Sequence, residues 1–290
     1  MAIQLVTKFL PYVDEQFSTE SKKSLLTNQD FDWTGAHTIK VYKVSTASMN
    51  DYARNGQVAY VQNSEGETIS VPLPSRYGII QDLDATTEEF TLKNDRSFTF
   101  AIDKLDTDET AQQLSAASAL ARQNREIVIP EVDAYVYGVM ANGAGYKPAA
   151  TTLTSENIYT AITDANTALD NAEVPETGRV LLVTPDTYLL MKRCKDIVLE
   201  TDIGTDMRLK GVIANLDGAV VIKVPKKRLP EKFGFMVAHP CATVAPTKLE
   251  DYKIHQDPPG ISGDLVEGRI CYDAFVLENK AKAIYYQAVK

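Results

Sequence analysis

Residues 95–140 constrain the fold of this chain more than any other segment, because a strand pattern there runs directly into a long helical pattern. Residues 97–102 alternate polar and apolar side chains, as a half-buried strand does. The helix that follows is predicted from about 107 to 140, interrupted only at Pro130. Since helices of globular proteins average about three turns, this one is expected to be a structural strut.

Acidic residues mark the expected start of this helix. Carboxylates favour the unpaired N–H groups and the positive dipole end of a first helical turn. The same acids could suggest a calcium loop, but such a loop needs a central glycine, which is missing. We therefore interpret them as structural. The residues are Asp103, Asp106, Asp108 and Glu109.

The second half of the helix has a regular apolar face. Val128, Val132, Tyr135 and Val139 recur at spacings of four, three and four residues, so they are predicted to lie on one buried face. Pro130 has no N–H to donate and clashes with the preceding turn, which predicts a bend or boundary there.

Segment 97–140, with its acidic start and the run VIPEVDAY, resembles the strand and spine helix of major capsid proteins of tailed bacteriophages. Further segments follow the same order as in that family, so the resemblance covers nearly the whole chain. These segments are RVLLVTPDTYLLMK (179–192), GAVVIKVP (218–225), FMVAHPCATVAP (235–246) and EGRICYDAFVLENKAKAIYY (267–286).

The resemblance implies an α+β fold of the Hong Kong 97 type. The expected parts are an N-terminal arm (1–35), a peripheral domain with the spine helix (36–50 and 88–150), an extended β-hairpin loop (51–87), a mostly axial domain (151–245) and the return strands of both domains (246–290).

The resemblance also implies a structural role: self-assembly into pentamers and hexamers of an icosahedral head that encloses double-stranded DNA without sequence-specific binding. The expected partners are copies of the chain, a scaffolding protein, a portal, and decoration or head-completion proteins. Assembly is expected in the bacterial cytoplasm and residence in the virion, with no membrane, cofactor, metal or catalytic residue. The candidate subunit-interface or conformational residues are Gln57, Tyr60, Arg76, Arg122, Arg125 and Pro130.

Strand patterns flank the expected loop. Residues 37–44 alternate apolar and polar side chains, and 89–102 form a return strand in which Phe98, Phe100 and Ile102 share one face. Between them, segment 51–87 is rich in turn formers and contains the strand-like pieces QVAYV and TISV. This composition favours an extended β-loop, since a structureless loop of that length is rare inside a compact domain.

The second half of the chain reads as alternating helices and buried strands. A helix with Thr154 or Ser155 as its cap is predicted to bury Ile158, Ile162, Ala165 and Leu169. Additional predicted features are a buried strand at 180–183, a helix start at Thr184-Pro185-Asp186, a tight turn at Asp217-Gly218, further strands at 219–224, 235–238 and 270–277, and a last strand in the tail.

The charge balance argues against a dedicated DNA-binding protein. The chain has 39 acidic and 30 basic residues, a formal net charge of -9, whereas nucleic-acid affinity depends on basic patches. The densest basic clusters, at 226–228 and 192–195, are interpreted as a solvated face or as intersubunit partners of carboxylates. No apolar run approaches the roughly 20 residues needed to span a bilayer.

Other function classes find little support. Three cysteines without paired spacing fit a reducing compartment, and His239, Cys241 and His255 lack the spacing of a zinc site. Segment 260–264 resembles a nucleophile elbow, but Asp264 stands where the second glycine belongs. A hydrolase is therefore a remote alternative, and an encapsulin-like nanocompartment that encloses protein cargo is the nearer one.

Overall fold

The structure of the protein is a computed structural model that describes residues 21–28, 38–52, 54, 58–62, 68–72, 76–77, 82–83, 85–105, 115–195, 197 and 215–290. The chain divides into two compact units, one of Met1–Gly35 with Leu92–Lys290 and one of Ala36–Thr91. Helices and strands are mixed, so the predicted α+β class is confirmed.

The smaller unit consists of two antiparallel ribbons. Strand β1 (Thr38–Val44) pairs with β4 (Ala85–Thr91), with Thr38 opposite Thr91. Strands β2 (Val58–Gln62) and β3 (Thr68–Pro72) pair with each other. The strand at 37–44 and the two short strands within the loop are therefore confirmed.

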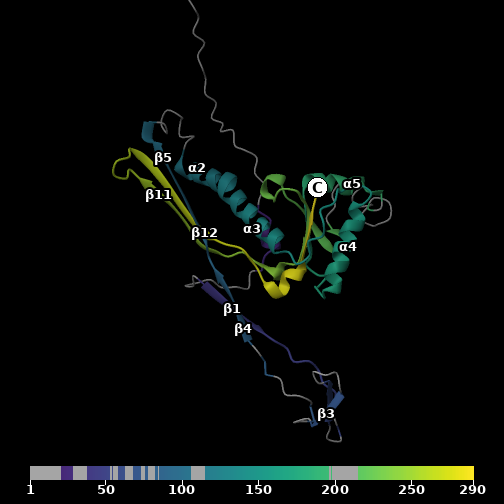
Figure 1. Cartoon of the computed structure of the whole chain (residues 1–290). Helices are drawn as coiled ribbons and strands as arrows, with labels where there is room; N and C mark the ends of the chain where they lie inside the picture. The colour runs from purple at the N-terminus through teal and green to yellow at the C-terminus, as the bar shows by residue number, and fades with distance from the viewer. Residues whose placement is uncertain are drawn as a thin grey trace, which may run out of the picture. The chain divides into compact units, whose positions relative to one another are not determined.

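The larger unit contains a sheet of three long antiparallel strands in the order β11-β12-β5. These are β5 (Asn94–Asp103), β11 (Thr247–Gln256) and β12 (Gly263–Tyr272). Phe98 and Phe100 pack with Ile102 and Val266 against the start of the long helix, which confirms that they share one face. Figure 1 shows this helix running alongside the sheet.

The long helix has three consecutive parts. They are α2 (Ala116–Gln123), a π-helical turn η2 (Asn124–Val128) and α3 (Ile129–Gly143). The residues at both junctions keep helical dihedral angles, so the helix is continuous from α2 through α3.

The predicted helix is interrupted at Ser115, although Lys104 and Leu105, directly after the predicted cap residue Asp103, are helical. Ser115 is extended, with φ -79° and ψ 142°, and its side chain accepts a hydrogen bond from the Ser118 N–H. This serine caps the helix, so a continuous helix from 107 is excluded. Asp103 lies at the end of β5 and accepts a hydrogen bond from the Leu105 N–H, 2.8 Å away. The other predicted acids fall in 106–114, outside the described residues.

The helix changes type next to Pro130, at 128/129, whereas a bend at Pro130 stays a prediction. Pro130 lies in the first turn of α3, immediately after the π-helical turn. The Ile129 N–H donates to the Asn124 carbonyl five residues earlier, instead of to the carbonyl four residues earlier. Because a proline inside a helix leaves an earlier carbonyl without its donor, a change of hydrogen-bonding register at this place accommodates it.

The face of α3 that is buried most deeply is shifted from the predicted one. Val132 is buried as predicted, whereas Val128, Tyr135 and Val139 are only partly buried at the edge of the core. The remaining buried residues of α3 are Asp133, Val136, Tyr137, Met140 and Ala141. The buried face of α3 is therefore wider than the predicted one. It includes a charged residue, Asp133, which the apolar spacing could not indicate.

A five-stranded sheet forms the second layer of the larger unit, in the order β14-β9-β6-β8-β7. Helices α4 (Ile158–Asn171) and α5 (Pro185–Arg193) pack on it. The strands are β6 (Val180–Val183), β7 (Asn215–Leu216), β8 (Ala219–Lys223), β9 (Phe233–Ala238) and β14 (Ile284–Ala288). The remaining elements are β10 (Thr243–Val244), β13 (Phe275–Val276), and the 3₁₀ turns η1 (Lys23–Leu25), η3 (Lys226–Arg228), η4 (Pro240–Ala242) and η5 (Glu278–Ala283).

Most local predictions in this layer are confirmed. All four residues of β6 are buried, and the Thr184 side chain accepts from the Thr187 N–H to cap α5. The predicted apolar face of α4 is buried, but its cap is Asn157 and not Thr154 or Ser155. The Asn157 side chain instead accepts from the Thr154 N–H, which closes a turn just before the helix.

Candidate assembly elements

A buried ion pair joins the long helix to the turn η3. Asp133 and Arg228 are 1% and 5% exposed, and their Oδ2 and Nη1 atoms are 2.9 Å apart. The Ser21 hydroxyl donates a second hydrogen bond to Asp133, at 2.6 Å. Arg228 was predicted to be part of a solvated basic cluster, and this is wrong: it faces inward because Asp133 compensates its charge in the core.

The segment of residues 21–28 is anchored beside this pair. Leu26 is fully buried in the core, and the Asn28 N–H donates to the Thr243 carbonyl at 2.7 Å. Burial lowers the pKa of Lys23, although Asp133 and then Glu250 act in the opposite direction. This segment therefore fixes the point from which the preceding part of the chain departs. The rest of the predicted arm lies outside the described residues.

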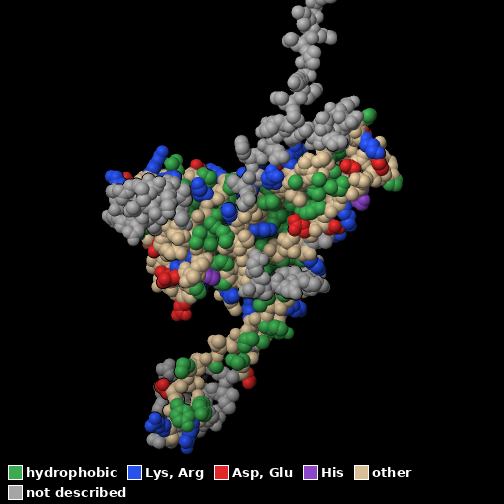
Figure 2. Space-filling model, turned by 180° about the vertical axis from the view of Figure 1, so that it is seen from behind, with side chains coloured by type: hydrophobic (Ala, Val, Ile, Leu, Met, Phe, Trp, Pro, Cys, Tyr) green, Lys and Arg blue, Asp and Glu red, His purple; other side chains and the backbone are tan. Residues whose placement is uncertain are grey.

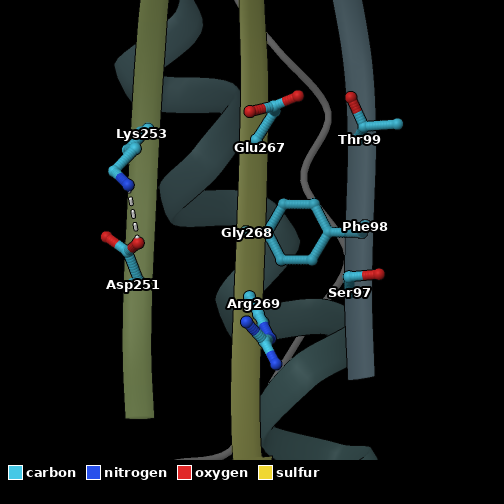
Figure 3. A pocket seen from close by; sticks show the side chains of 8 residues that line it. All are labelled: Ser97, Phe98, Thr99, Asp251, Lys253, Glu267, Gly268 and Arg269. Atoms are coloured by element: carbon cyan, nitrogen blue, oxygen red, sulfur yellow. Dashed lines mark ion pairs between the residues drawn. The ribbon is translucent and has the colours of Figure 1, made fainter. Parts of the chain in front are cut away.

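Charged side chains line one face of the three-stranded sheet. Arg269 on β12 donates two hydrogen bonds to Asp95 on β5, at 2.9 and 2.5 Å, and these bonds lower the pKa of Asp95. Lys253 pairs with Asp251 along β11 at 2.9 Å. Figure 3 shows the shallow hollow beside these strands. Its lining residues are Ser97, Phe98, Thr99, Asp251, Lys253, Glu267, Gly268 and Arg269.

Gly268 is required by the close packing of this sheet. A Cβ atom at this position would lie 2.3 Å from the Phe98 ring, which leaves no room for a side chain. Figure 3 shows the ring of Phe98 directed at this glycine. The glycine thus lets an aromatic side chain on the neighbouring strand lie flat against the backbone of β12.

Two small cavities flank the π-helical turn. One has a volume of about 180 Å³ and lies between the helix and the sheet, where Ile127 and Val128 face Phe98 and Ile270. The other, about 200 Å³, brings Asn124 together with Lys23. Because close packing resists movement, these spaces leave room for side chains around the turn to shift.

The smaller unit exposes large apolar side chains. Met49 is 99% exposed, Tyr77 78% and Tyr42 74%. Tyr52 and Tyr77 make an edge-to-face contact with ring centroids 5.0 Å apart. Figure 2 shows hydrophobic side chains on the surface. Contiguous exposed apolar side chains are typical of surfaces that another protein covers.

The predicted interface residues do not form one site. Arg122, Arg125 and Pro130 lie on the long helix, where Arg125 is exposed and the other two are half-buried. Tyr60 and Arg76 belong to the smaller unit; Tyr60 is opposite Ser70 in the hairpin, and Arg76 is exposed. Gln57 lies outside the described residues. Their role at interfaces stays a prediction.

The alternative sites from the sequence have other local explanations. His239 Nδ1 accepts from the Cys241 N–H at 3.2 Å, and His255 lies 3.3 Å from Glu267 on the sheet. Segment 260–264 runs from the connection between β11 and β12 into the start of β12 at Gly263, and the Ser262 carbonyl accepts from the Lys104 N–H at 3.1 Å. Over the described ranges, no group of three or more His, Cys, Asp or Glu side chains is arranged to hold a metal ion.

Compared by sequence, the chain matches no family model and none of the curated proteins. Compared by structure, it matches a chain of Mycobacterium phage Che8 with a TM-score of 0.76 and 15% identity over 98% of this chain and 96% of that one. The capsid of cyanophage P-SCSP1u matches with a TM-score of 0.73 and 14% identity, over 98% and 93%. The fold is of the Hong Kong 97 type.

Two further solved structures also match this chain. The mature capsid of bacteriophage PhiM1 matches with a TM-score of 0.69 and 11% identity, over 98% of this chain and 92% of that one. A virus-like particle from Pyrococcus furiosus matches with a TM-score of 0.52 and 11% identity, over 92% of each chain. In the described part of this chain, no helix is long and apolar enough to cross a membrane.

Proposed function

We propose that this protein is the major capsid protein of a tailed double-stranded DNA bacteriophage. The observation that carries the proposal is likeness over the whole chain to phage capsid structures, including the extended smaller unit as well as the core. Copies assemble into pentamers and hexamers of an icosahedral head. Its function is then geometric, with no catalytic residue and no cofactor.

The parts of the chain take the roles expected in such a shell. Residues 1–35 form an arm anchored through 21–28, and 51–87 reach over a neighbouring copy. The exposed side chains of Tyr52 and Tyr77 support this role, because they lack cover in the isolated unit. Residues 36–50 and 88–150 form the peripheral domain, 151–245 mostly the axial domain, and 246–290 return through both.

The proposed partners follow from this role. They are other copies of the chain, a scaffolding protein, a portal, and decoration or head-completion proteins, with assembly in the bacterial cytoplasm. The net charge of -9 supports an enclosed DNA that is held without sequence-specific binding. The protein would then reside in the virion.

A nanocompartment that encloses protein is the second candidate, supported by the virus-like particle from Pyrococcus furiosus. Its TM-score of 0.52 is below the 0.76 and 0.73 of the first two phage structures, which favours the phage capsid.

Electron microscopy of the purified protein, expressed alone and with its neighbouring genes, tests the proposal. Closed polyhedral shells are expected, and nucleic acid inside them would separate a phage head from a protein-filled compartment. A uniform monomer or dimer in every preparation would contradict both candidates.

A further inference from the structure

Two lysine side chains share one aromatic ring in the layer of the five-stranded sheet. The ammonium nitrogens of Lys223 and Lys192 lie 4.5 and 5.2 Å from the ring centroid of Tyr188. Neither ammonium has a carboxylate partner among the described residues. Two cations brought together without an anion repel each other, so this place favours an anionic group from outside the chain.

Two more lysines extend the positive surface. Lys226 and Lys227 are exposed in η3, immediately after β8. Arg228 in the same turn faces inward to Asp133, and this buried pair fixes the turn so that its two lysines face outward. We call this surface the basic patch. It consists of Lys192, Lys223, Lys226 and Lys227.

A loop of opposite charge follows α4. The buried Arg179 shapes it: its Nη2 atom donates to Asp170 at 2.7 Å and to the Val174 carbonyl at 2.6 Å. Glu173 is held in the left-handed region at φ 58°, and Glu176 is exposed. A loop fixed in this way presents its carboxylates in one place without further ordering.

A neighbouring turn adds another carboxylate. Asp217, between β7 and β8, is exposed and accepts from the Asn166 side chain at 2.7 Å. Asp217 and Gly218 both have positive φ, 49° and 76°, as the predicted tight turn requires. We call the surface of Asp170, Glu173, Glu176 and Asp217 the acidic edge.

The two surfaces lie at opposite ends of the same strands. Strands β6 and β8 are parallel, with Val180 opposite Val220 and Val183 opposite Lys223. The acidic edge precedes both strands, whereas Lys223 ends β8 and α5 follows β6. At a rise of about 3.3 Å per residue, the four residues of β6 separate the two ends by about 13 Å.

We propose that the basic patch of one copy binds the acidic edge of the next copy, in a head-to-tail contact. Lysines outnumber the exposed carboxylates Asp186 and Glu231 at one end, and carboxylates gather at the other, which favours this arrangement. Like charges oppose a two-fold pairing of patch with patch. A head-to-tail contact repeated around an axis closes a ring. This inference rests on the proposed function, because it assigns the contact that closes pentamers and hexamers.

Charge reversal and its compensation test the contact. The first variant is K223E/K226E, the second is E173K/E176K, and the third combines all four substitutions. Native mass spectrometry at low salt counts rings, and electron microscopy counts shells. Lys282→Glu, an exposed lysine outside the patch, is the matched control. Circular dichroism checks that each variant folds. If the introduced glutamates impair folding, K223Q/K226Q removes the two positive charges without reversing them.

We expect each reversal to reduce ring formation roughly tenfold or more, because like charges then face each other. The combined variant should restore rings, and the control should behave as the parent. Normal rings from either reversal, or no recovery in the combined variant, would overturn the contact. A reversed patch that forms normal shells but loses nucleic acid would assign it to DNA instead. Rings without shells from the parent chain would support the contact while refuting the proposed capsid.

Discussion

The two units of this chain stabilise themselves in different ways. In the larger unit, side chains from both layers cover one another, and Leu181 and Leu182 on adjacent positions of β6 are both fully buried in different cores. In the smaller unit, a two-stranded ribbon leaves Tyr42 and Val44 exposed. Since isolated two-stranded ribbons are marginally stable in water, the first unit is specified by its own core and the second by what covers it.

The largest destabilisation of the larger unit is expected when one partner of its buried ion pair is removed. Asp133→Ala leaves Arg228 buried without a counter-charge, so we expect a loss of about 3–5 kcal/mol of unfolding free energy. Denaturant unfolding of the unassembled protein measures it. Asp164→Ala, at an exposed site, should change stability by less than about 0.5 kcal/mol. Similar values for both variants would contradict the importance of the pair.

A smaller loss of stability is expected at Gly268, where the three-stranded sheet leaves no space for a side chain. Gly268→Ala places a methyl group against the Phe98 ring, which must move, at a cost of about 1–3 kcal/mol. Thermal unfolding measures the change. The double variant with Phe98→Leu should be less destabilised than the sum of the single changes, because the two residues are in contact. Strict additivity would show that the ring is not the obstacle.

Pro130→Ala tests whether the proline beside the π-helical turn affects the stability of the larger unit and the geometry of the particle. Alanine regains an N–H for a helical hydrogen bond but also loosens the unfolded chain. These two effects oppose each other, so the unfolding free energy should change by less than about 1 kcal/mol. We also expect a change in shell size or in expansion, because the π-helical turn no longer has a proline beside it. Cryo-electron microscopy of the particles measures both, and unchanged particles that expand normally would exclude Pro130 as the bend.

The Asp95–Arg269 pair should make a still smaller contribution to stability, and this contribution depends on pH. The Arg269 guanidinium lowers the pKa of Asp95, so the pair stabilises the fold above the ordinary value of 3.8 and loses this contribution as the pH falls through the lower folded value. Asp95→Asn should therefore narrow the stability difference between neutral and acidic pH slightly. Acid unfolding curves of both proteins would show it. A larger difference in stability between neutral and acidic pH in Asp95→Asn would contradict a lowered pKa of Asp95 in the folded state.

Deleting residues 57–74 should have the smallest effect on folding and a complete effect on assembly. The unfolding free energy of the larger unit should stay within about 0.5 kcal/mol of the parent, because no core residue of that unit is removed. Shells should be absent by electron microscopy. Normal shells from this variant would exclude the loop as an assembly element.

Local patterns predicted the elements whose signals lie within a few residues. The strand β6, the Thr184 cap and the Asp217-Gly218 turn are examples, because their periodicity or turn chemistry is decided by adjacent residues. The interruption of the long helix at Ser115 was not predicted, because the four acids upstream offered a stronger cap signal. A serine followed three residues later by a second serine was the signal that could have found it.

Long-range partners could not be predicted in this way. Asp133 and Arg228 are 95 positions apart in sequence, so neither residue alone indicates that the other compensates it. The basic patch has the same origin, since Lys192 and Lys223 meet only through the fold. The predicted interface residues, Tyr60 and Arg122 among them, depend on neighbours outside the chain and stay predictions.

The pairing of β5 with β12 also has a consequence for the order of synthesis. Asp103 lies opposite Gly263 and Asn94 opposite Tyr272, so the sheet cannot close until the ribosome has translated the chain beyond Tyr272. Until then, β5 and the long helix lack one of the strands on which they pack. A nascent chain therefore cannot form the finished surface of this sheet before β12 is made, and in the proposed capsid translation itself would delay assembly until then.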